Sequence, residues 1–452
     1  MQRTTLPAAL AAGALLLSLT GCGGDAEAGG KTVTVTVGYQ SKTINTTTAG
    51  TLLRSLGYFE RELRALGHRK GVTYKVKWQD YATGAPITAQ MVAGKVDIGS
   101  MGDFPLLINS GRGTQLNAPT RLVSVTGYNL RGGLNTIVTK PGSKLRDLSD
   151  LRGKKVSTSV GSAADGTLVR ALQGAGIDPE NGVEKLNQQP AVGASALEAG
   201  SVDALSQFVA WPGLLAFQGK AKALYDGARL NLPTFHGVTA RDAFAHDNPD
   251  VLQAFLSAQI DATRYLDDHP LTAAQKVAKA TGLPPEVVYL YNGEGGISTF
   301  DPALKPALIA ALKKDVPILR KAKLTGPVDV KSFIDDRYLK RAYGSAGAYA
   351  KALRAAPPAS PNQVWLQGEN TVRSFPSSAA LLRFTAAHQG KVRAAYVPDA
   401  GTGTRWFADR AVWAEDGGQP HAFVSAANAR TWIAAHPGAR TVSYATALKE
   451  AK

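Results

Sequence analysis

A single cysteine, Cys22, sets the strongest limit on how this chain folds and where it works. It follows a basic start at Arg3 and an apolar run over 6–19, and small flexible residues come after it. This layout is typical of a bacterial lipoprotein signal, in which the cysteine is lipidated after cleavage. The apolar run is shorter than the about 20 residues that a membrane-spanning helix needs. We therefore expect a signal peptide over 1–21 and a lipid-anchored tether over 22–30.

The use of this thiol for lipidation leaves the fold without a disulfide, a cysteine nucleophile or a cysteine-based metal site. The alternative is an ordinary secretion signal with an incidental cysteine, which predicts export without a lipid anchor. The core must then come from apolar packing. A length of 452 residues, with 44% hydrophobic and 19% charged residues, allows two or three globular domains.

The formal net charge is +16 at pH 7, and the lysines and arginines are scattered along the chain. The sequence has no dense basic run and no basic stripe interleaved with aromatic residues, so we expect no nucleic-acid partner. The favoured interpretation of the charge is solubility and attraction to an anionic membrane surface.

The first half of the chain alternates short β-type runs with helical periodicity. We expect strands at 33–37, 74–78, 96–99, 121–125, 136–139, 155–160, 183–187, 222–224 and 237–239. We expect helices at 51–66, 89–92, 148–152, 167–175 and 194–200. Alternation of this kind predicts an α/β fold, with a parallel sheet covered by helices in the first unit.

Helices dominate after Pro249, and a separate small unit closes the chain. The expected helices cover 251–267, 271–281, 284–290, 302–312, 330–333 and 337–343. The composition of 355–361, Ala-Ala-Pro-Pro-Ala-Ser-Pro, is that of a linker. The last unit is expected to be α+β, with strands at 392–397, 411–414, 421–424 and 441–443 and a helix at 426–435.

Ligands of open α/β sheets bind outside the carboxyl ends of the strands. The loops at three strand ends carry candidate contacts: Gln40 with Ser41, Gly102 with Asp103, and Ser159 with Gly161 and Ser162. The Gly161–Ser162 pair opens a helix, so it offers backbone N–H groups, a hydroxyl and the positive end of the helix dipole to an anion. The alternative is a serine that caps the helix beside a turn glycine.

Other candidate residues each have a structural alternative. Asp103 is either a helix cap or a partner for a ligand amine. Trp211 either stacks on a ligand or belongs to the core, and Arg131 either binds an oxyanion or is solvated. Tyr128 lies in the segment between the two units, and His236 lies where the chain crosses back, where a structural role is the default.

Motifs for catalysis are missing from the sequence. It has no Gly-x-Ser-x-Gly elbow, no His-Glu-x-x-His motif and no Walker loop, and its 7 histidines are scattered. We therefore expect no enzyme activity, no cofactor and no metal site.

Residues 31–345 resemble the substrate-binding proteins of nitrate, sulfonate and taurine ABC importers. The matching segments are 38–40, 95–105, 147–156, 161–162, 201–204 and 211–212. The resemblance implies a two-lobed, periplasmic-binding-protein-like (type II) fold with two crossover strands and a ligand enclosed between the lobes. It places the anionic group of that ligand near Gly161–Ser162. It also assigns contacts to Gln40, Gly102 and Asp103 in the first lobe and to Trp211 in the second, where Pro212 replaces the usual acidic residue.

The implied division of the chain has a first lobe over 31–130 and 236–345, a second lobe over 131–235, a linker over 346–361 and a C-terminal α+β domain over 362–452. The tail resembles the copper-accessory lipoproteins of nitrous oxide reductase assembly, in the string that runs from His421 and again at His436-Pro437-Gly438, but without methionine or cysteine ligands.

The function implied is that of an extracytoplasmic solute-binding lipoprotein, which captures a small anionic solute and delivers it to ABC permease subunits. Three alternatives remain at this point. A receptor for a thiamine-type pyrimidine would pair Asp103 with a ring amine. A pyrimidine-precursor synthase shares the fold but carries a cysteine-rich motif that this chain lacks. A metal-handling protein would act through the tail.

Overall fold

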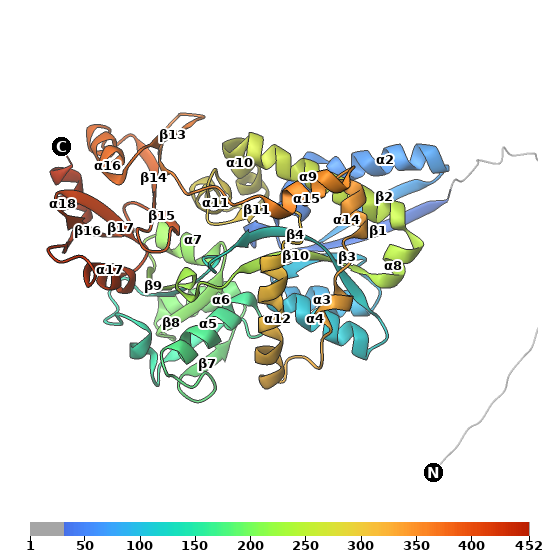
Figure 1. The fold of residues 1–452 in the computed structure, drawn as a ribbon, viewed down its shortest axis with the longest axis horizontal. Coiled ribbons are helices and arrows are strands. Elements are labelled where there is room, and N and C mark those ends of the chain that lie inside the picture. Colours follow the sequence, from blue (N-terminus) through green and yellow to red (C-terminus); the bar gives the residue numbers. More distant parts are fainter. Residues whose placement is uncertain (1–30, 452) are drawn as a thin grey trace, which may run out of the picture.

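The computed structural model describes residues 31–451, so the predicted signal peptide, Cys22 and nearly all of the tether lie outside the described residues. Figure 1 shows two lobes, with the strands β4 and β10 running toward the boundary between them, and a C-terminal domain that lies beside both lobes. Each lobe is built around its own mixed sheet, and the C-terminal domain has two small sheets.

Lobe 1 has a six-stranded sheet in the order β11-β4-β10-β3-β1-β2. Its strands are β1 (Thr32–Tyr39), β2 (Thr73–Asp80), β3 (Ile98–Gly102), β4 (Thr120–Asn129), β10 (Thr234–Arg241) and β11 (Thr299–Phe300). Its helices are η1 (Ile44–Ala49), α1 (Thr51–Leu56), α2 (Tyr58–Lys70), α3 (Gly84–Val92), α4 (Asp103–Gln115), α8 (Asp242–Asp247), α9 (Pro249–Asp268), α10 (Pro270–Thr281), α11 (Pro285–Asn292), α12 (Pro306–Lys321), α13 (Val330–Phe333) and α14 (Arg337–Ala342).

The parallel sheet expected for the first unit is confirmed for β1, β2 and β3, whereas the complete sheet of lobe 1 is mixed. Strand β1 pairs in parallel with β2 and β3, but β10 is antiparallel to both β3 and β4. The reason is the chain path, because β10 returns from lobe 2 and so enters the sheet against the direction of the outgoing strands. Local periodicity carries no information about this reversal.

Helices cover both faces of the lobe 1 sheet. On one face, Val35 of β1 belongs to a core with Phe59 of α2 and Phe255 of α9, whose rings lie 5.2 Å apart edge to face. On the other face, Leu106 of α4 and Leu308 of α12 form a second core. Burial of each such side chain contributes about 1.5–3 kcal/mol to folding, so both faces of the sheet are well supported.

Several helices differ from their predicted bounds, and two of the differences have a clear local cause. The single helix predicted over 51–66 is broken at Gly57, which has φ +63° and separates α1 from α2. The helix predicted over 302–312 instead begins at Pro306 and continues past Pro317 to Lys321. Proline is well suited to the first turn of a helix, where its missing N–H would have no partner.

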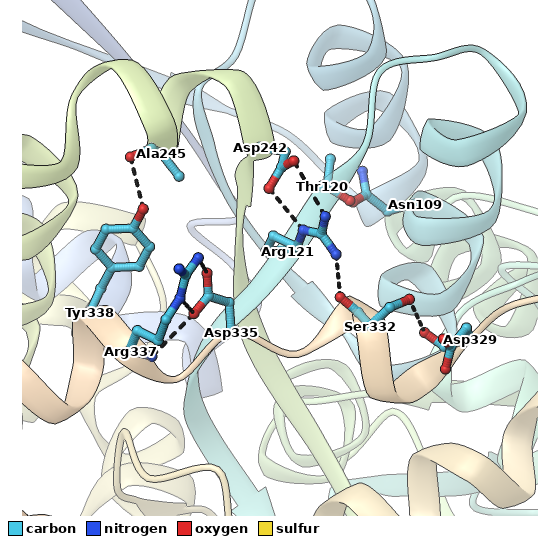
Figure 2. A network of polar contacts seen from close by, with 10 residues as sticks. All are labelled: Asn109, Thr120, Arg121, Asp242, Ala245, Asp329, Ser332, Asp335, Arg337 and Tyr338. Atoms are coloured by element: carbon cyan, nitrogen blue, oxygen red, sulfur yellow. Dashed lines mark hydrogen bonds and ion pairs between the residues drawn. The ribbon is translucent and has the colours of Figure 1, made fainter.

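A polar network, shown in Figure 2, fixes the segment before α14 against β4 and α8. Arg121 of β4 donates to Asp242 at 2.8 and 3.3 Å and also to the carbonyl of Ser332. Arg337 donates to Asp335 at 2.8 and 2.7 Å. This network holds the end of lobe 1 in place, remote from the boundary with lobe 2.

Lobe 2 has a five-stranded sheet in the order β7-β6-β8-β5-β9. Its strands are β5 (Asn135–Thr139), β6 (Lys155–Thr158), β7 (Glu184–Asn187), β8 (Ala204–Phe208) and β9 (Lys222–Asp226). Its helices are η2 (Leu148–Leu151), α5 (Ala163–Gly174), α6 (Pro190–Ala199), α7 (Trp211–Phe217) and η3 (Gly227–Leu230). The chain passes between the two sheets twice, from β4 to β5 and from β9 to β10, which confirms the predicted two-lobed fold class.

The segment predicted as a linker, 346–361, begins with a helix, α15 (Ala346–Arg354), whose Tyr349 is buried in the core of lobe 1. The C-terminal domain that follows has β12 (Asn362–Leu366), β13 (Val372–Phe375), α16 (Ser378–Ala387), β14 (Val392–Pro398), β15 (Arg405–Phe407), β16 (Val412–Asp416), β17 (Gln419–Phe423), α17 (Ala426–Ile433), β18 (Arg440–Val442) and α18 (Tyr444–Glu450). The sequence predicted this α+β character but missed β12, β13, β15, α16 and α18.

Within the part of the chain that the structure describes, no helix combines the length and the apolar character needed to cross a membrane.

Candidate functional site

The two lobes are in direct contact on both sides of their boundary. On one side, a Cβ atom added to Gly166 of α5 would lie 2.3 Å from the ring of Phe104 on α4, so the two helices touch closely. On the other side, the N–H of Gly213 in α7 donates to the hydroxyl of Tyr291 in α11 at 2.9 Å. The structure therefore describes a closed arrangement of the lobes.

The strand ends of both sheets meet between these two contacts. Gly102 ends β3 and is the register partner of His236 on β10. A Cβ atom on Gly102 would lie 3.0 Å from Nε2 of His236 and 3.4 Å from the Cβ of Ala163, the first residue of α5 in lobe 2. Glycine at this position thus allows the two lobes to approach, and the structure brings the predicted residues Gly102 and His236 together.

The imidazole of His236 is neutral. Burial lowers its pKa to about 3, and the amide nitrogen of Asn45 contacts its Nδ1 atom. With Nδ1 as acceptor, the proton sits on Nε2, which lies beside Gly102. His236 thus offers an uncharged N–H donor near the lobe boundary.

Asp103 begins α4 and is almost completely buried. Its carboxyl oxygens accept hydrogen bonds from the backbone N–H groups of Phe104, at 2.8 Å, and Phe235, at 3.4 Å. Burial raises its pKa to about 8, and the nearby carboxylate of Asp315 adds to the shift. Asp103 therefore carries a proton at neutral pH and serves the backbone where α4 meets β10.

The backbone donor expected to be free at Gly161 is occupied by a side chain of the same helix. The N–H of Gly161 donates to Oδ2 of Asp165 at 2.9 Å, and Ser162 caps the helix by accepting from the N–H of Asp165 at 3.3 Å. Burial raises the pKa of Asp165, while Lys185, 3.4 Å away, opposes that shift. The serine-cap alternative is correct here, and a carboxylate stands where the sequence predicted a bound anion.

Several other candidates support loops. Gln40 donates to the carbonyl of Ser100 at 3.0 Å, and Ser41 bonds to Asp80 through its backbone N–H at 2.8 Å and its hydroxyl at 2.6 Å. Ser159 donates to the carbonyl of Gln188 at 2.9 Å. These side chains fix the loops at the strand ends.

Trp211 and Tyr128 lie in different surroundings. Trp211 begins α7 and packs, half-buried, against the apolar core between α6 and β8. Tyr128 is buried and lines a separate cavity of about 600 Å³ in lobe 1, together with Phe300 and Asp267. The structure therefore does not bring Tyr128 into the lobe boundary around Gly102.

Three fully buried amides near the strand ends were missed by the sequence analysis: Asn45 of η1, Asn135 at the start of β5 and Gln207 near the end of β8. Among the described residues, nothing bonds to Oδ1 of Asn45, Oδ1 of Asn135 or Oε1 of Gln207. Each of these amides lies close in sequence to the end of a buried strand, and this position could have marked it as a candidate.

The orientation of two of these amides follows from their neighbours. Asn135 donates to the carbonyl of Ala163 at 3.4 Å, which can only accept, and to Oγ1 of Thr167 at 2.9 Å. Gln207 donates to the hydroxyl of Ser159 at 3.2 Å. Because Ser159 gives its own proton to a carbonyl, it must accept from Gln207. The unpartnered atom of Gln207 is thus a carbonyl oxygen, which is a hydrogen-bond acceptor.

Across residues 31–451, the structure gathers no group of three His, Cys, Asp or Glu side chains able to hold a metal ion.

Comparisons with known proteins agree with this architecture. Residues 69–273 match the family model described as NMT1/THI5 like. The taurine-binding periplasmic protein of Escherichia coli (strain K12) is 26% identical over 323 residues, which cover 70% of this chain and 91% of that protein.

Two solved structures share the fold. The alkanesulfonate-binding protein of Xanthomonas axonopodis pv. citri, bound to MOPS, has 22% identity and a TM-score of 0.56, covering 67% of this chain and 98% of that one. The periplasmic nitrate-binding protein of Synechocystis PCC 6803 has 13% identity and a TM-score of 0.55, covering 73% and 92%. The predicted resemblance is confirmed for the two lobes, whereas that of the tail stays a prediction. Over residues 69–273 the chain is thus similar to the NMT1/THI5-like family, and its two lobes share the fold of these binding proteins.

Proposed function

We propose that this chain is the extracytoplasmic solute-binding lipoprotein of an ABC importer and that it captures a small solute between its lobes. The observation that supports this most directly is the set of unpartnered amide oxygens on Asn45, Asn135 and Gln207 near the strand ends. A buried polar atom without a partner costs about 1–3 kcal/mol. A solute that donates hydrogen bonds to these oxygens recovers that energy and favours the closed form.

The chemistry of these groups narrows the solute class. The unpartnered oxygen of Gln207 is an acceptor, so it selects a solute with N–H donors. The neutral His236 offers a donor through Nε2, which suits an oxyanion. An aminosulfonate such as taurine has both an ammonium and a sulfonate group, and we propose it ahead of plain alkanesulfonates and nitrate. A thiamine-type pyrimidine is the second candidate, because its ring amine also matches the acceptor oxygens.

Capture follows from differential affinity for two arrangements of the lobes. A solute that contacts both lobes binds the closed form more tightly than an open one, so it shifts the population toward closure. In this proposal, the closed form is the one presented to the permease subunits, and a lipid on Cys22 keeps the protein at the outer face of the membrane. We propose binding rather than catalysis, since residues 31–451 contain no thiol and the curated relative reported above is a binding protein.

The test is a set of thermal melts and calorimetric titrations with taurine, butanesulfonate, nitrate and an aminopyrimidine. A solute present at 100 times its Kd adds about 2.7 kcal/mol of stability. We expect taurine to give the largest shift. We expect Gln207→Leu to weaken taurine binding at least about tenfold, the result of leaving one donor unpaired.

Gln173→Leu is the matched control, because Gln173 is exposed on α5. It is expected to leave the affinity unchanged. If none of the four compounds raises the melting temperature, the proposed solute class is wrong. If taurine binds equally well to Gln207→Leu and to the wild type, the site is not at the lobe boundary.

A further inference from the structure

The C-terminal domain, residues 362–451, contacts both lobes at once. Figure 1 shows it beside α11 of lobe 1 and beside α7 and β9 of lobe 2. One continuous apolar cluster contains Tyr289 of lobe 1, Ala216 of lobe 2 and Trp406 of the C-terminal domain. Any movement of one lobe relative to the other must therefore disturb one of the two contacts of this domain.

The contact with lobe 1 is deeply buried. The buried guanidinium of Arg405 lies against the rings of both Tyr289 and Tyr396, with its central carbon 5.0 and 4.3 Å from the ring centres. It donates to the carbonyl of Glu294 at 2.6 Å. The hydroxyl of Tyr396 donates to the carbonyl of Glu286 at 3.0 Å. Separation here would expose a buried cation and several aromatic rings.

The connection through α15 adds to this attachment. The ammonium of Lys305 pairs with Asp301 at 2.7 Å and donates to the carbonyl oxygens of Ala352 and, at 3.0 Å, Ala355. Lys305 thereby caps the C-terminal end of α15 against lobe 1. The chain enters the C-terminal domain only a few residues later, so the domain is fixed to lobe 1 by both its interface and its connection.

The contact with lobe 2 adds polar groups to the apolar cluster described above. Asp226, the last residue of β9, is fully buried. It accepts a hydrogen bond of 2.7 Å from the hydroxyl of Thr402 and one of 3.4 Å from the amide nitrogen of Asn428. The same amide nitrogen donates to Asp399 at 2.8 Å. One amide of the C-terminal domain thus joins a carboxylate of its own domain to a carboxylate of lobe 2.

Two further contacts complete this side. Arg430 donates to the carbonyl of Arg146 at 3.0 Å and to Asp147 at 3.3 Å, with both charged side chains nearly half exposed. Phe217 packs against Phe407 with ring centres 5.5 Å apart. Compared with the buried Arg405, the contacts of Arg430 are partly solvated, so they separate more readily.

We propose that the C-terminal domain is a clasp, which stays with lobe 1 and holds lobe 2 closed through Thr402, Asn428 and Arg430. These three residues position lobe 2, and they do not need to touch the solute. The lobes then open only when the clasp lets go of β9 and the η2 segment. This proposal does not depend on which solute binds, because the clasp acts on the lobes when no solute is present.

The test measures the distance between the lobes without solute, by pulsed dipolar electron paramagnetic resonance. The background is Cys22→Ser, which removes the only native cysteine. Spin labels are attached at Lys42→Cys in lobe 1 and Gln189→Cys in lobe 2, both exposed and both next to strand ends. The labelled protein with an unchanged C-terminal domain is expected to give one dominant short distance between the two labels.

The clasp variant is Thr402→Val with Arg430→Ala, and we expect it to raise the long-distance population about fivefold or more, as loss of these hydrogen bonds implies. The matched control is Thr441→Val with Arg440→Ala. It changes the same residue types in the same domain, where Arg440 pairs only with Glu415 and Glu450 among the contacts described. The control is expected to keep the short distance. The single variant Thr402→Ser retains the hydroxyl and leaves Arg430 unchanged, so it is also expected to keep the short distance.

Melting curves of each variant confirm that the domain remains folded, and Arg430→Ala alone provides a mild second variant at an exposed site. A clasp variant that stays folded and keeps the short distance overturns the proposal. An equal opening in the control also overturns it. Since no solute is added, failure of the proposed solute class leaves this result unaffected.

Discussion

Arg170 on α5 of lobe 2 donates a hydrogen bond of 2.6 Å to Asp315 on α12 of lobe 1. Asp315 is only 4% exposed, so the guanidinium of Arg170 takes the place of the water molecules that would otherwise solvate its carboxylate. Burial raises the pKa of Asp315 to about 6, and Arg170 opposes that shift. This ion pair connects the two lobes at the closed boundary, so its removal tests how much the closed form depends on it.

Replacement of Arg170 by methionine is expected to lower the free energy of unfolding by about 3 kcal/mol, the lower end of the range for breaking a buried pair, because Arg170 is partly exposed. Urea denaturation measures this. The double variant Arg170→Met with Asp315→Leu is expected to recover most of the loss, since it leaves no buried carboxylate without a partner. If Arg170→Met lowers the free energy of unfolding by no more than the double variant does, the expectation is contradicted.

Replacement of Gly166 by alanine tests the contact between α5 and α4. In an exposed helix interior, this change stabilises by about 1 kcal/mol. Here the new Cβ atom would lie 2.3 Å from the ring of Phe104, so we expect a lower melting temperature or a wider lobe distance. Gly174→Ala in the same helix is the control, because nothing lies within 4 Å of its added Cβ. Equal effects of the two substitutions would rule out a close lobe contact at Gly166.

Asp103 is expected to make the protein less stable as the pH rises. Its pKa of about 8 in the folded protein lies above the usual value near 3.9, so between these values the folded state holds a proton that the unfolded state has lost. Stability therefore falls as pH rises from about 4 to 8, by at most about 1.4 kcal/mol per pH unit.

The variant Asp103→Asn cannot titrate at this position. We compare the free energy of unfolding of this variant with that of the wild type, by urea denaturation at each pH. The difference, variant minus wild type, is expected to be larger at pH 8 than at pH 5. A constant difference across that range would show that Asp103 is ionised in the folded protein.

His236 produces the opposite slope on the acid side. Its pKa of about 3 in the folded protein lies below the usual value near 6.5. As the pH falls below about 6.5, the unfolded chain takes up a proton that the folded protein refuses, so stability is lost down to about pH 3. His236→Gln is expected to lose less stability between pH 7 and pH 4.5 than the wild type. His246→Gln, at an exposed histidine, is the control and should follow the wild type.

Much of the architecture was predictable because it is written in local patterns. The alternating Val and Thr residues of 33–37 form the centre of β1, and the periodic apolar residues of 251–267 form α9. The direction of β10 was not predictable in this way, because it depends on the chain having crossed to lobe 2 and back.

The candidate site was predicted only in part. Gly102 and His236 do come together, because strand ends of one sheet share an edge. The N–H of Gly161, which the sequence offered to an anion, donates instead to Asp165, one helical turn away. A sequence lists these donors and acceptors but does not say which of them pair.

The division into two lobes was implied by the family resemblance. The local patterns of the sequence determined the α/β class, the order of most strands and helices, and the small α+β unit at the end of the chain. These features follow from periodicity and turn chemistry within a few residues. Only the tertiary structure decided that Asn45 meets His236, that Arg170 meets Asp315 and that Asn428 bridges to Asp226. The physical reason is that each of these pairs joins segments more than a hundred residues apart, whose contact is fixed by packing and by the pairing of buried polar groups.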